Sequence, residues 1–256
     1  NTNGNNRGDV LNFVTMVHAF DNKKIKVTKN DYGKLTFRLE KLAEANNFDS
    51  SNSHEAIADV EVTMKLMCLL KNKRSDLFKI FFNNSSARNV EENIFQNDLF
   101  TLHNYLFNNH KIYLVKKLIK HPSYKNQFIG FDMKYDVEEL VKLSESELKE
   151  EYKKKSFFRK IKLNKQPSIL DKSHALKFKP YSNLSNEEID RKCRLLDDKN
   201  FLKNLENILQ KESLEYLDNQ SQEAQLEEST IYSQNLNYND SFLMKDFHNQ
   251  PWDLKW

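Results

Sequence analysis

The stretch FRLEKLAEANNFDSSNSHEAIADVEVTMKLMCLLK, residues 37–71, carries the densest pattern in this chain of 256 residues. From His54 to Lys71 it holds no Gly or Pro and spaces its apolar residues helically, after a cluster of helix-capping side chains at residues 49–53. We therefore expect one long helix there. Asp59 falls within the apolar arc of that helix, where a carboxylate is costly unless it has a cation or a metal ion as partner.

His54 lies five residues before Asp59, at the first turn of the expected helix. A His and an Asp at this spacing could bind a metal ion and deprotonate a water molecule. The spacing alone is weak evidence, because a capping His and a salt-bridged Asp would give the same pattern. His248 and Asp253 repeat it around Pro251, without a helical context. The choice between a metal-binding pair and a capping His with a salt-bridged Asp therefore depends on the neighbouring residues.

Those neighbours match a family signature. The matching positions are Phe37-Arg38-Leu39-Glu40, Leu42, Ala45-Asn46, Ser51-Asn52, His54, Ala56 and Ala58-Asp59-Val60. In order and spacing they resemble exonuclease I, a bacterial 3′→5′ exonuclease family specific for single-stranded DNA. That family belongs to the DEDD exonucleases, which have an RNase-H-like fold.

The resemblance implies roles for four residues. Asp59 would bind a catalytic divalent metal ion, with Mg²⁺ expected and Mn²⁺ as the alternative, and His54 would act as general base on the attacking water. Arg38, with Phe37 beside it, would bind the DNA backbone near the scissile phosphate. We also expect residues 34–45 to form a helix, with Arg38 near its start, where a cation opposes the helix dipole unless it meets an anion.

The first acidic motif of such exonucleases is Asp-x-Glu on an apolar strand, and no such strand precedes His54. The resemblance thus implies that this chain starts partway through the exonuclease domain and stops short of the end of the C-terminal domain. Without the preceding strands, the apolar residues Ile57, Val60, Met64 and Met67 should be left uncovered. If the chain nevertheless cleaved DNA, Asp132 and Asp136 would be the first alternative metal ligands.

We expect an α+β fold in three parts. Residues 1–75 would be the C-terminal, helical part of an RNase-H-like exonuclease domain. Residues 76–222 would be an SH3-like β-barrel domain with helical insertions, because short apolar runs alternate with turns from residue 100 onward. Residues 223–256 would begin a helical C-terminal domain.

A basic stretch lies within the expected SH3-like domain. Between residues 153 and 179 there are ten Lys or Arg and one acid, Asp171, with Phe side chains interleaved. Cations that neutralise phosphates, combined with aromatic platforms for bases, are typical of proteins that bind single-stranded nucleic acid. Lys160, Lys162 and Lys165 are therefore candidate substrate-binding residues. A solvated basic face over core aromatics would show the same composition.

Composition limits the remaining alternatives. No apolar run is long enough to span a membrane, and the two Cys residues are read as reduced packing residues of a cytoplasmic protein. The net charge of +3 predicts no partner by itself. The resemblance implies a monomer that acts on 3′ ends of single-stranded DNA in DNA repair or recombination, with single-stranded-DNA-binding protein as a partner. A non-catalytic single-strand-binding module and an RNA-directed DEDD exonuclease are the alternatives.

Overall fold

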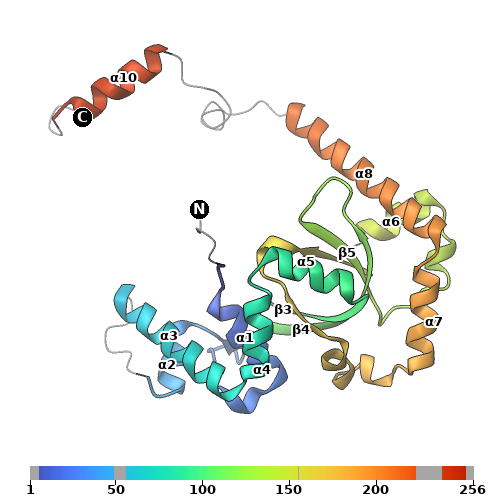
Figure 1. Ribbon diagram of the computed structural model, residues 1–256, viewed down its shortest axis with the longest axis horizontal. Helices are drawn as coiled ribbons and strands as arrows, with labels where there is room; N and C mark the ends of the chain where they lie inside the picture. Colours follow the sequence, from blue (N-terminus) through green and yellow to red (C-terminus); the bar gives the residue numbers. More distant parts are fainter. Residues whose placement is uncertain (1–5, 49–55, 155, 223–237, 252–256) are drawn as a thin grey trace. The chain divides into compact units, whose positions relative to one another are not determined.

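The computed structural model describes residues 6–48, 56–154, 156–222 and 238–251. It is a mixed structure of helices and antiparallel strands, which confirms the α+β prediction (Figure 1). The helices are α1 (Val10–Phe20), α2 (Leu39–Ala45), α3 (Ala56–Lys73), α4 (Ser75–Asn83), α5 (Ala87–Gln96), α6 (Glu145–Lys153), α7 (Asn186–Leu196), α8 (Lys199–Gln222) and α10 (Tyr238–Asn249). The strands are β1 (Thr28–Lys29), β2 (Leu35–Thr36), β3 (Leu99–Leu106), β4 (Asn109–Lys120), β5 (Gln127–Asp132), β6 (Phe158–Lys162) and β7 (Ser168–Asp171).

The chain divides into two compact units, residues 1–210 and residues 211–256. In the second unit, the side chains of α10 are all exposed. Within the described ranges, no helix is both long enough and apolar enough to cross a membrane.

The first four helices share one apolar core. Helix α1 begins where the carboxylate of Asp9 accepts a hydrogen bond from the backbone N–H of Leu11 at 2.9 Å, as an N-cap does. The core buries Phe13 of α1 and Leu66 of α3, together with Leu170 of the distant strand β7. The helical segment and the sheet domain are therefore packed on each other.

Helix α3 has a broad exposed apolar surface. Its side chains Ile57, Val60 and Met64 are 77%, 58% and 61% exposed, whereas Leu66 and Leu70 of the same helix are buried. The expectation of an uncovered face is confirmed for Ile57, Val60 and Met64, whereas Met67, expected with them, is half-buried. Their spacing still follows one face of the helix, as an amphipathic pattern requires.

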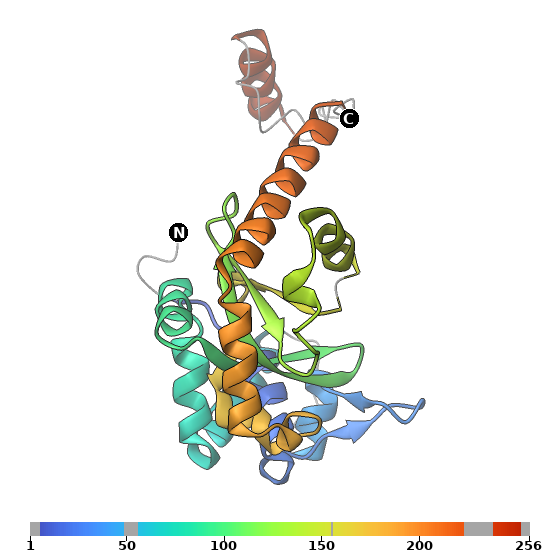
Figure 2. The ribbon, with the colours of Figure 1, turned by 90° about the vertical axis from the view of Figure 1, so that its right-hand side faces the viewer.

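The predicted helix at residues 34–45 is wrong at its start. Leu35 and Thr36 form strand β2, which pairs with β1 across a turn where Gly33 has a φ of 71°. Figure 2 shows this short two-stranded ribbon extending from the helices. Arg38 is the extended N-cap of α2, with a φ of −61° and a ψ of 137°, so it precedes the helix. Arg38 therefore lies at the positive end of the α2 dipole as its N-cap residue and not within the first helical turn.

The main sheet has the strand order β6-β5-β4-β3-β7, with every neighbouring pair antiparallel. Strands β3 and β4 form a hairpin whose tip residues, Phe107 and Asn108, both have positive φ angles of 51° and 60°. This two-residue tip matches the right-handed twist of the flanking strands. Strand β4 also has an irregular register between Lys117 and Ile119.

Both faces of the sheet are covered. Helix α5 lies across one face (Figure 1), where Val90 and Ile94 join a core with Phe128 of β5. On the other face, Ile129 and Phe131 of the same strand pack with residues of α6, α7 and α8. Successive residues of β5 thus point into different cores, as the pleat of a strand requires.

Candidate nucleic-acid interface and adjoining pocket

Of the two residues with expected catalytic roles, only Asp59 belongs to the described part of the chain. His54 lies outside the described residues. Asp59 lies in the first turn of α3, where it is half-buried and its backbone carbonyl accepts a hydrogen bond from Thr63 Oγ1 at 2.7 Å. A search of the described ranges finds no group of three His, Cys, Asp or Glu side chains that could hold a metal ion. On their own, the residues described do not make up a Mg²⁺ site.

Asp132 is engaged in the core. Its carboxylate is fully buried and accepts hydrogen bonds from Arg159 Nη2 and Tyr181 Oη, each at 2.6 Å. Burial, and then the hydrogen bond to Asp132, raise the pKa of Tyr181 above its usual range. A buried carboxylate held by a cation and a hydroxyl is a structural group. Asp136 is exposed, and its Oδ1 accepts hydrogen bonds from the backbone N–H groups of Val137 at 2.6 Å and Glu138 at 3.1 Å. Neither arrangement supports a metal-ligand role for Asp132 or Asp136.

Phe37 and Arg38 point to different surroundings. Phe37 is 9% exposed, and its ring meets Tyr105 edge-on with centroids 4.8 Å apart. Tyr105 also donates a hydrogen bond from its hydroxyl to the carbonyl of Leu35 at 3.1 Å. The segment before α2 is thereby fastened to strand β3, and Arg38 is exposed beside it. Substrate contact by either residue stays a prediction.

The three candidate lysines lie along the edge of the sheet. Lys160 and Lys162 are exposed on the edge strand β6, and Lys165 is exposed in the short 3₁₀ helix η3 (Leu163–Lys165) that follows it. The ammonium group of Lys160 lies 5.1 Å from the ring centroid of Tyr152, within cation–π range. Neither Lys162 nor Lys165 forms a salt bridge with any residue of the described ranges.

Many other cations of this domain are neutralised by acids from distant parts of the chain. Lys116 is 3% exposed and its ammonium lies 2.9 Å from Asp197 and 3.5 Å from Asp98. Lys117 binds Asp98 at 2.6 Å, and Lys120 binds Glu91. A basic run in the sequence is thus not by itself a basic surface. Lys162 and Lys165 differ from this group because they remain available to an external anion.

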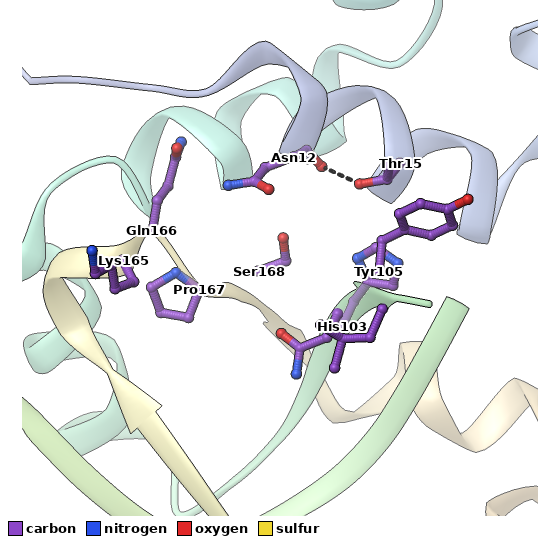
Figure 3. A pocket seen from close by; sticks show the side chains of 10 residues that line it. Asn12, Thr15, His103, Tyr105, Lys165, Gln166, Pro167 and Ser168 are labelled. Atoms are coloured by element: carbon purple, nitrogen blue, oxygen red, sulfur yellow. Dashed lines mark hydrogen bonds between the residues drawn. The ribbon is translucent and has the colours of Figure 1, made fainter. Parts of the chain in front are cut away.

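Beside Lys165 the chain forms a pocket with a volume of about 200 Å³. Its walls come from α1, from β3 and from the loop between η3 and β7. Figure 3 shows Asn12 and Thr15 of α1 across the pocket from Ser168 and from His103. The full lining is Asn12, Thr15, His103, Asn104, Tyr105, Leu106, Lys165, Gln166, Pro167 and Ser168.

Gln166 links two walls of this pocket through its side chain. Its backbone has a φ of 47°, in the left-handed region that residues other than Gly seldom adopt. Its Oε1 accepts a hydrogen bond from the backbone N–H of Asp9 at 2.7 Å, which ties the loop to the start of α1. Its Nε2 is buried and has no hydrogen-bond partner among the residues that the structure describes. The side-chain amide is therefore anchored at its oxygen and unsatisfied at its nitrogen.

A line of three histidines runs to the pocket from α1. His18 Nδ1 lies 2.9 Å from His110 Nε2, and His110 Nδ1 lies 3.0 Å from His103 Nε2. His103 is 2% exposed, and its remaining nitrogen, Nδ1, has no hydrogen-bond partner within the described part of the chain. Burial lowers the pKa of His103 to about 3 and that of His110 to about 4, and it also lowers the pKa of His18. The line is therefore uncharged at neutral pH.

The sequence patterns pointed to Lys165 but not to the pocket beside it. Gln166 carries no signal in the sequence, because its left-handed backbone is set by the turn and by Asp9, 157 positions away. His103 and His110 flank a two-residue hairpin tip, and this offers the one usable signal, since paired strands bring such residues together. The third member, His18, comes from a helix whose packing on the sheet is not encoded locally.

Residues 88–219 match the family described as the Exonuclease I SH3-like domain. Exodeoxyribonuclease I of Haemophilus influenzae is 33% identical over 151 residues, covering 57% of this chain and 32% of the relative. The solved structure of E. coli Exonuclease I with a dT13 oligonucleotide superposes with a TM-score of 0.63 at 22% identity, covering 96% of this chain and 54% of that one. The ExoI/SSB-Ct complex gives a TM-score of 0.64 at 20% identity, covering 96% and 53%.

Because the solved structures are only 20–22% identical to this chain, their superposition shows a shared fold and does not by itself show a shared activity. The lengths also differ. This chain spans about a third of the Haemophilus relative and about half of each solved chain.

Proposed function

Because the chain belongs to the exonuclease I family, whose SH3-like domain it carries at residues 88–219, we propose that it serves in the 3′→5′ degradation of single-stranded DNA to mononucleotides. The observation that carries this proposal is the family match itself, which covers more than half of the chain. The named relatives are exodeoxyribonucleases, and one solved relative was studied with a single-stranded oligonucleotide. Work in DNA repair or recombination belongs to the same proposal.

Binding of the strand is assigned to the edge of the sheet. Lys160, Lys162 and Lys165 follow one another along β6 and η3, and all three are exposed. Lys162 and Lys165 form no salt bridge with a described residue, so a phosphate would not have to displace an internal partner. Arg38 is a further candidate from the segment before α2. Cations in such a row follow the backbone of a single strand without reading its sequence.

The cleavage step is assigned by the resemblance to His54 and Asp59. We propose that His54 accepts the proton of the attacking water and that Asp59 is one ligand of a divalent metal ion. The ion, when bound, would supply stabilisation of negative charge on the phosphate. Since Asp59 is a single carboxylate, the remaining ligands would come from water, from the substrate and from carboxylates outside the described residues.

A partner is also proposed on the strength of the fold. One solved relative was studied as a complex with SSB-Ct, and that structure superposes on 96% of this chain. We propose that the C-terminal segment of a single-stranded-DNA-binding protein is a partner of this protein as well.

Strand binding is tested by the triple substitution of Lys160, Lys162 and Lys165 with Ala. Each phosphate contact contributes about 0.7 to the slope of log binding constant against log salt concentration for a single strand, so the slope should shrink by about 2. Fluorescence anisotropy of a labelled oligo(dT) at several salt concentrations gives this slope.

The matched control removes three exposed lysines that already pair with an acid three residues away in the chain: Lys41, Lys142 and Lys153. The control variant has the same net charge as the test variant. An equal loss of slope in both variants would mean that net charge, and not this edge of the sheet, attracts the strand.

Cleavage is tested in a form of the protein that degrades DNA. His54→Ala is expected to lower kcat by roughly 100-fold or more, the usual contribution of a general base, with little change in DNA affinity. Asp59→Ala should abolish Mg²⁺-dependent cleavage. Glu61→Ala is the control, because Glu61 lies on the same helix and pairs with Lys65 at 3.8 Å. A loss of less than threefold for His54→Ala would make His54 a capping residue.

A further inference from the structure

The tip of the β3–β4 hairpin exposes an aromatic ring to solvent. Phe107 is 90% exposed, which is the largest fraction among the exposed large apolar side chains of the described ranges, and Leu106 before it is 47% exposed. Burial of such a ring would stabilise the fold, and at this position the fold gains nothing from it. Single exposed apolar side chains are common, however, so exposure alone assigns no role to Phe107.

The backbone at the tip is unfavourable for a Phe. Its φ of 51° lies in the left-handed region, which Gly, Asn and Asp adopt readily and an aromatic residue does not. Two-residue hairpin tips with two positive φ angles favour Asn and Gly for this reason, and Asn108 follows that preference. Phe107 therefore strains the turn that it forms. Residues held in such conformations cluster at ligand-binding sites.

The charges around the tip favour a polyanion as the ligand. The hairpin segment 104–111 contains no acidic residue and ends at Lys111. Lys111 is exposed and forms no salt bridge within the described part of the chain. It lies four residues after Phe107 on strand β4, and with a rise of about 3.3 Å per residue this places it roughly 10 Å from the tip.

A second cation reaches the hairpin from the neighbouring strand. The antiparallel pairing of β3 with β7 aligns His103 with Ser168, so residues 104–106 run beside residues 165–167. Lys165 and Leu106 accordingly line the same pocket. The row of exposed lysines on β6 and η3 thus ends beside the hairpin whose tip carries the exposed ring.

We propose that Phe107 stacks on a base of the bound single strand, while Lys111 and Lys165 contact phosphates of neighbouring nucleotides. The inference rests on the proposed function and adds to it a point at which a base, and not only the backbone, is held. Every base has a π-face, so an aromatic platform flanked by cations binds a single strand without reading its sequence. Removal of successive nucleotides requires this tolerance.

Tyr32 provides a matched exposed aromatic that lacks these features. It is 85% exposed in the turn of the β1–β2 ribbon, and its backbone is not left-handed. Asp31 directly precedes it, and a carboxylate at this position repels a phosphate. We therefore expect Tyr32 to contribute nothing to strand binding.

The test compares Phe107→Asn with Tyr32→Asn in the whole chain, by fluorescence anisotropy of a labelled oligo(dT). Asn suits the left-handed backbone, so Phe107→Asn should keep or raise the urea midpoint of unfolding. Its affinity for oligo(dT) should nevertheless fall at least about fivefold, the scale of one lost base stack. The slope of log binding constant against log salt concentration should not change, because no phosphate contact is removed. Tyr32→Asn should leave both the affinity and the slope unchanged.

Three further variants separate stacking from a simple apolar contact. Phe107→Tyr keeps a flat ring and should retain the affinity. Phe107→Leu keeps an apolar side chain without a ring and should lose as much affinity as Phe107→Asn. In Phe107→Trp the indole reports on the stack directly. Its fluorescence should be quenched by oligo(dT) beyond any change that Trp252 and Trp256 give in the unsubstituted protein.

An oligonucleotide of abasic sugar-phosphate units supplies the phosphates without the bases. It should bind the unsubstituted protein and Phe107→Asn equally. Equal affinity of these two proteins for oligo(dT) overturns the proposal, and so does full retention of affinity by Phe107→Leu. Either result leaves the lysine slope test, and with it the proposed function, untouched. Failure of the unsubstituted chain to bind oligo(dT) would contradict the proposed strand binding and this inference together.

Discussion

At the scale of single residues, the line from His18 through His110 to His103 makes the fold sensitive to acid. The folded-state pKa of His103, about 3, lies below the value of about 6.5 expected in the unfolded chain. Between these values the unfolded chain binds a proton that the folded chain does not. The unfolding free energy is therefore unaffected by His103 well above pH 6.5, and it decreases as the pH falls from 6.5 towards 3.

Because neutral His103 makes the unfolding free energy fall as the pH falls, removing its titrating ring in His103→Gln should weaken this pH dependence. Between pH 7 and pH 5, the unsubstituted protein should lose about 2 kcal/mol of unfolding free energy through His103, and the variant should not. Urea denaturation at both pH values measures the difference. His248→Gln, at an exposed position on α10, is the control and should keep the full pH dependence. Identical pH dependence in all three proteins would show that His103 is not kept neutral by burial.

The sequence predicted individual residues where a family signature or an unpaired charge marked them. It singled out Asp59, which is half-buried on α3, and Lys165, which is exposed at the pocket. It had no means of finding Gln166, whose role depends on a turn and on a backbone N–H far away in the chain. The same holds for Lys116, which reads as a surface cation and is buried between two aspartates. Pairing of distant charges is a property of the packing and not of the local pattern.

At the scale of elements, long periodic segments were predicted and short ones were not. The expected long helix is confirmed at α3, and the short apolar runs expected from residue 100 onward correspond to strands β3, β4 and β5. The error before Arg38 arose because Leu35 and Thr36 continue the apolar spacing of α2 but pair with β1 instead. Two-residue strands gain their hydrogen bonds from a partner, so a single-sequence pattern gives little warning of them.

Gly130 shows how an element depends on one position. A Cβ placed on it would lie 2.3 Å from Val115 Cγ1 and 3.2 Å from the carbonyl oxygen of Lys116. Gly130 lies on β5, between β4 and β6, so neither neighbour has room to withdraw. Gly130→Ala is therefore expected to cost about 1–3 kcal/mol of unfolding free energy, as overpacking does.

The control is the same chemical change at Gly33, where a Cβ would meet nothing within 4 Å. Its positive φ makes Ala unfavourable there by about 1 kcal/mol, without any clash. Urea denaturation of both variants gives the comparison. A smaller loss for Gly130→Ala than for Gly33→Ala would mean that strand β5 yields more easily than its packing indicates.

At the scale of the whole molecule, strand β7 joins the helical segment to the sheet domain, because its residues are buried in the cores of both. Strand β7 puts Ile169 into the core under α5 and its neighbour Leu170 into the core of α1, α3 and α4. Asn84 adds a hydrogen bond to the carbonyl of Ile169 at 2.9 Å. The division at residue 75 remains a prediction, and the helical core continues past it to Phe81 and Leu170.

A strand shared by two cores predicts that both cores unfold together. Leu170→Ala removes a side chain that is 3% exposed in the helical core, which should cost about 2–5 kcal/mol. If the cores form one cooperative unit, amide hydrogen exchange should accelerate by a similar factor in α1 and in β5, although Leu170 packs with α1 and not with the apolar side chains of β5. Leu214→Ala, at a position 61% exposed on α8, should leave both rates unchanged. Faster exchange in α1 alone would show that the helical segment opens while the sheet stays folded.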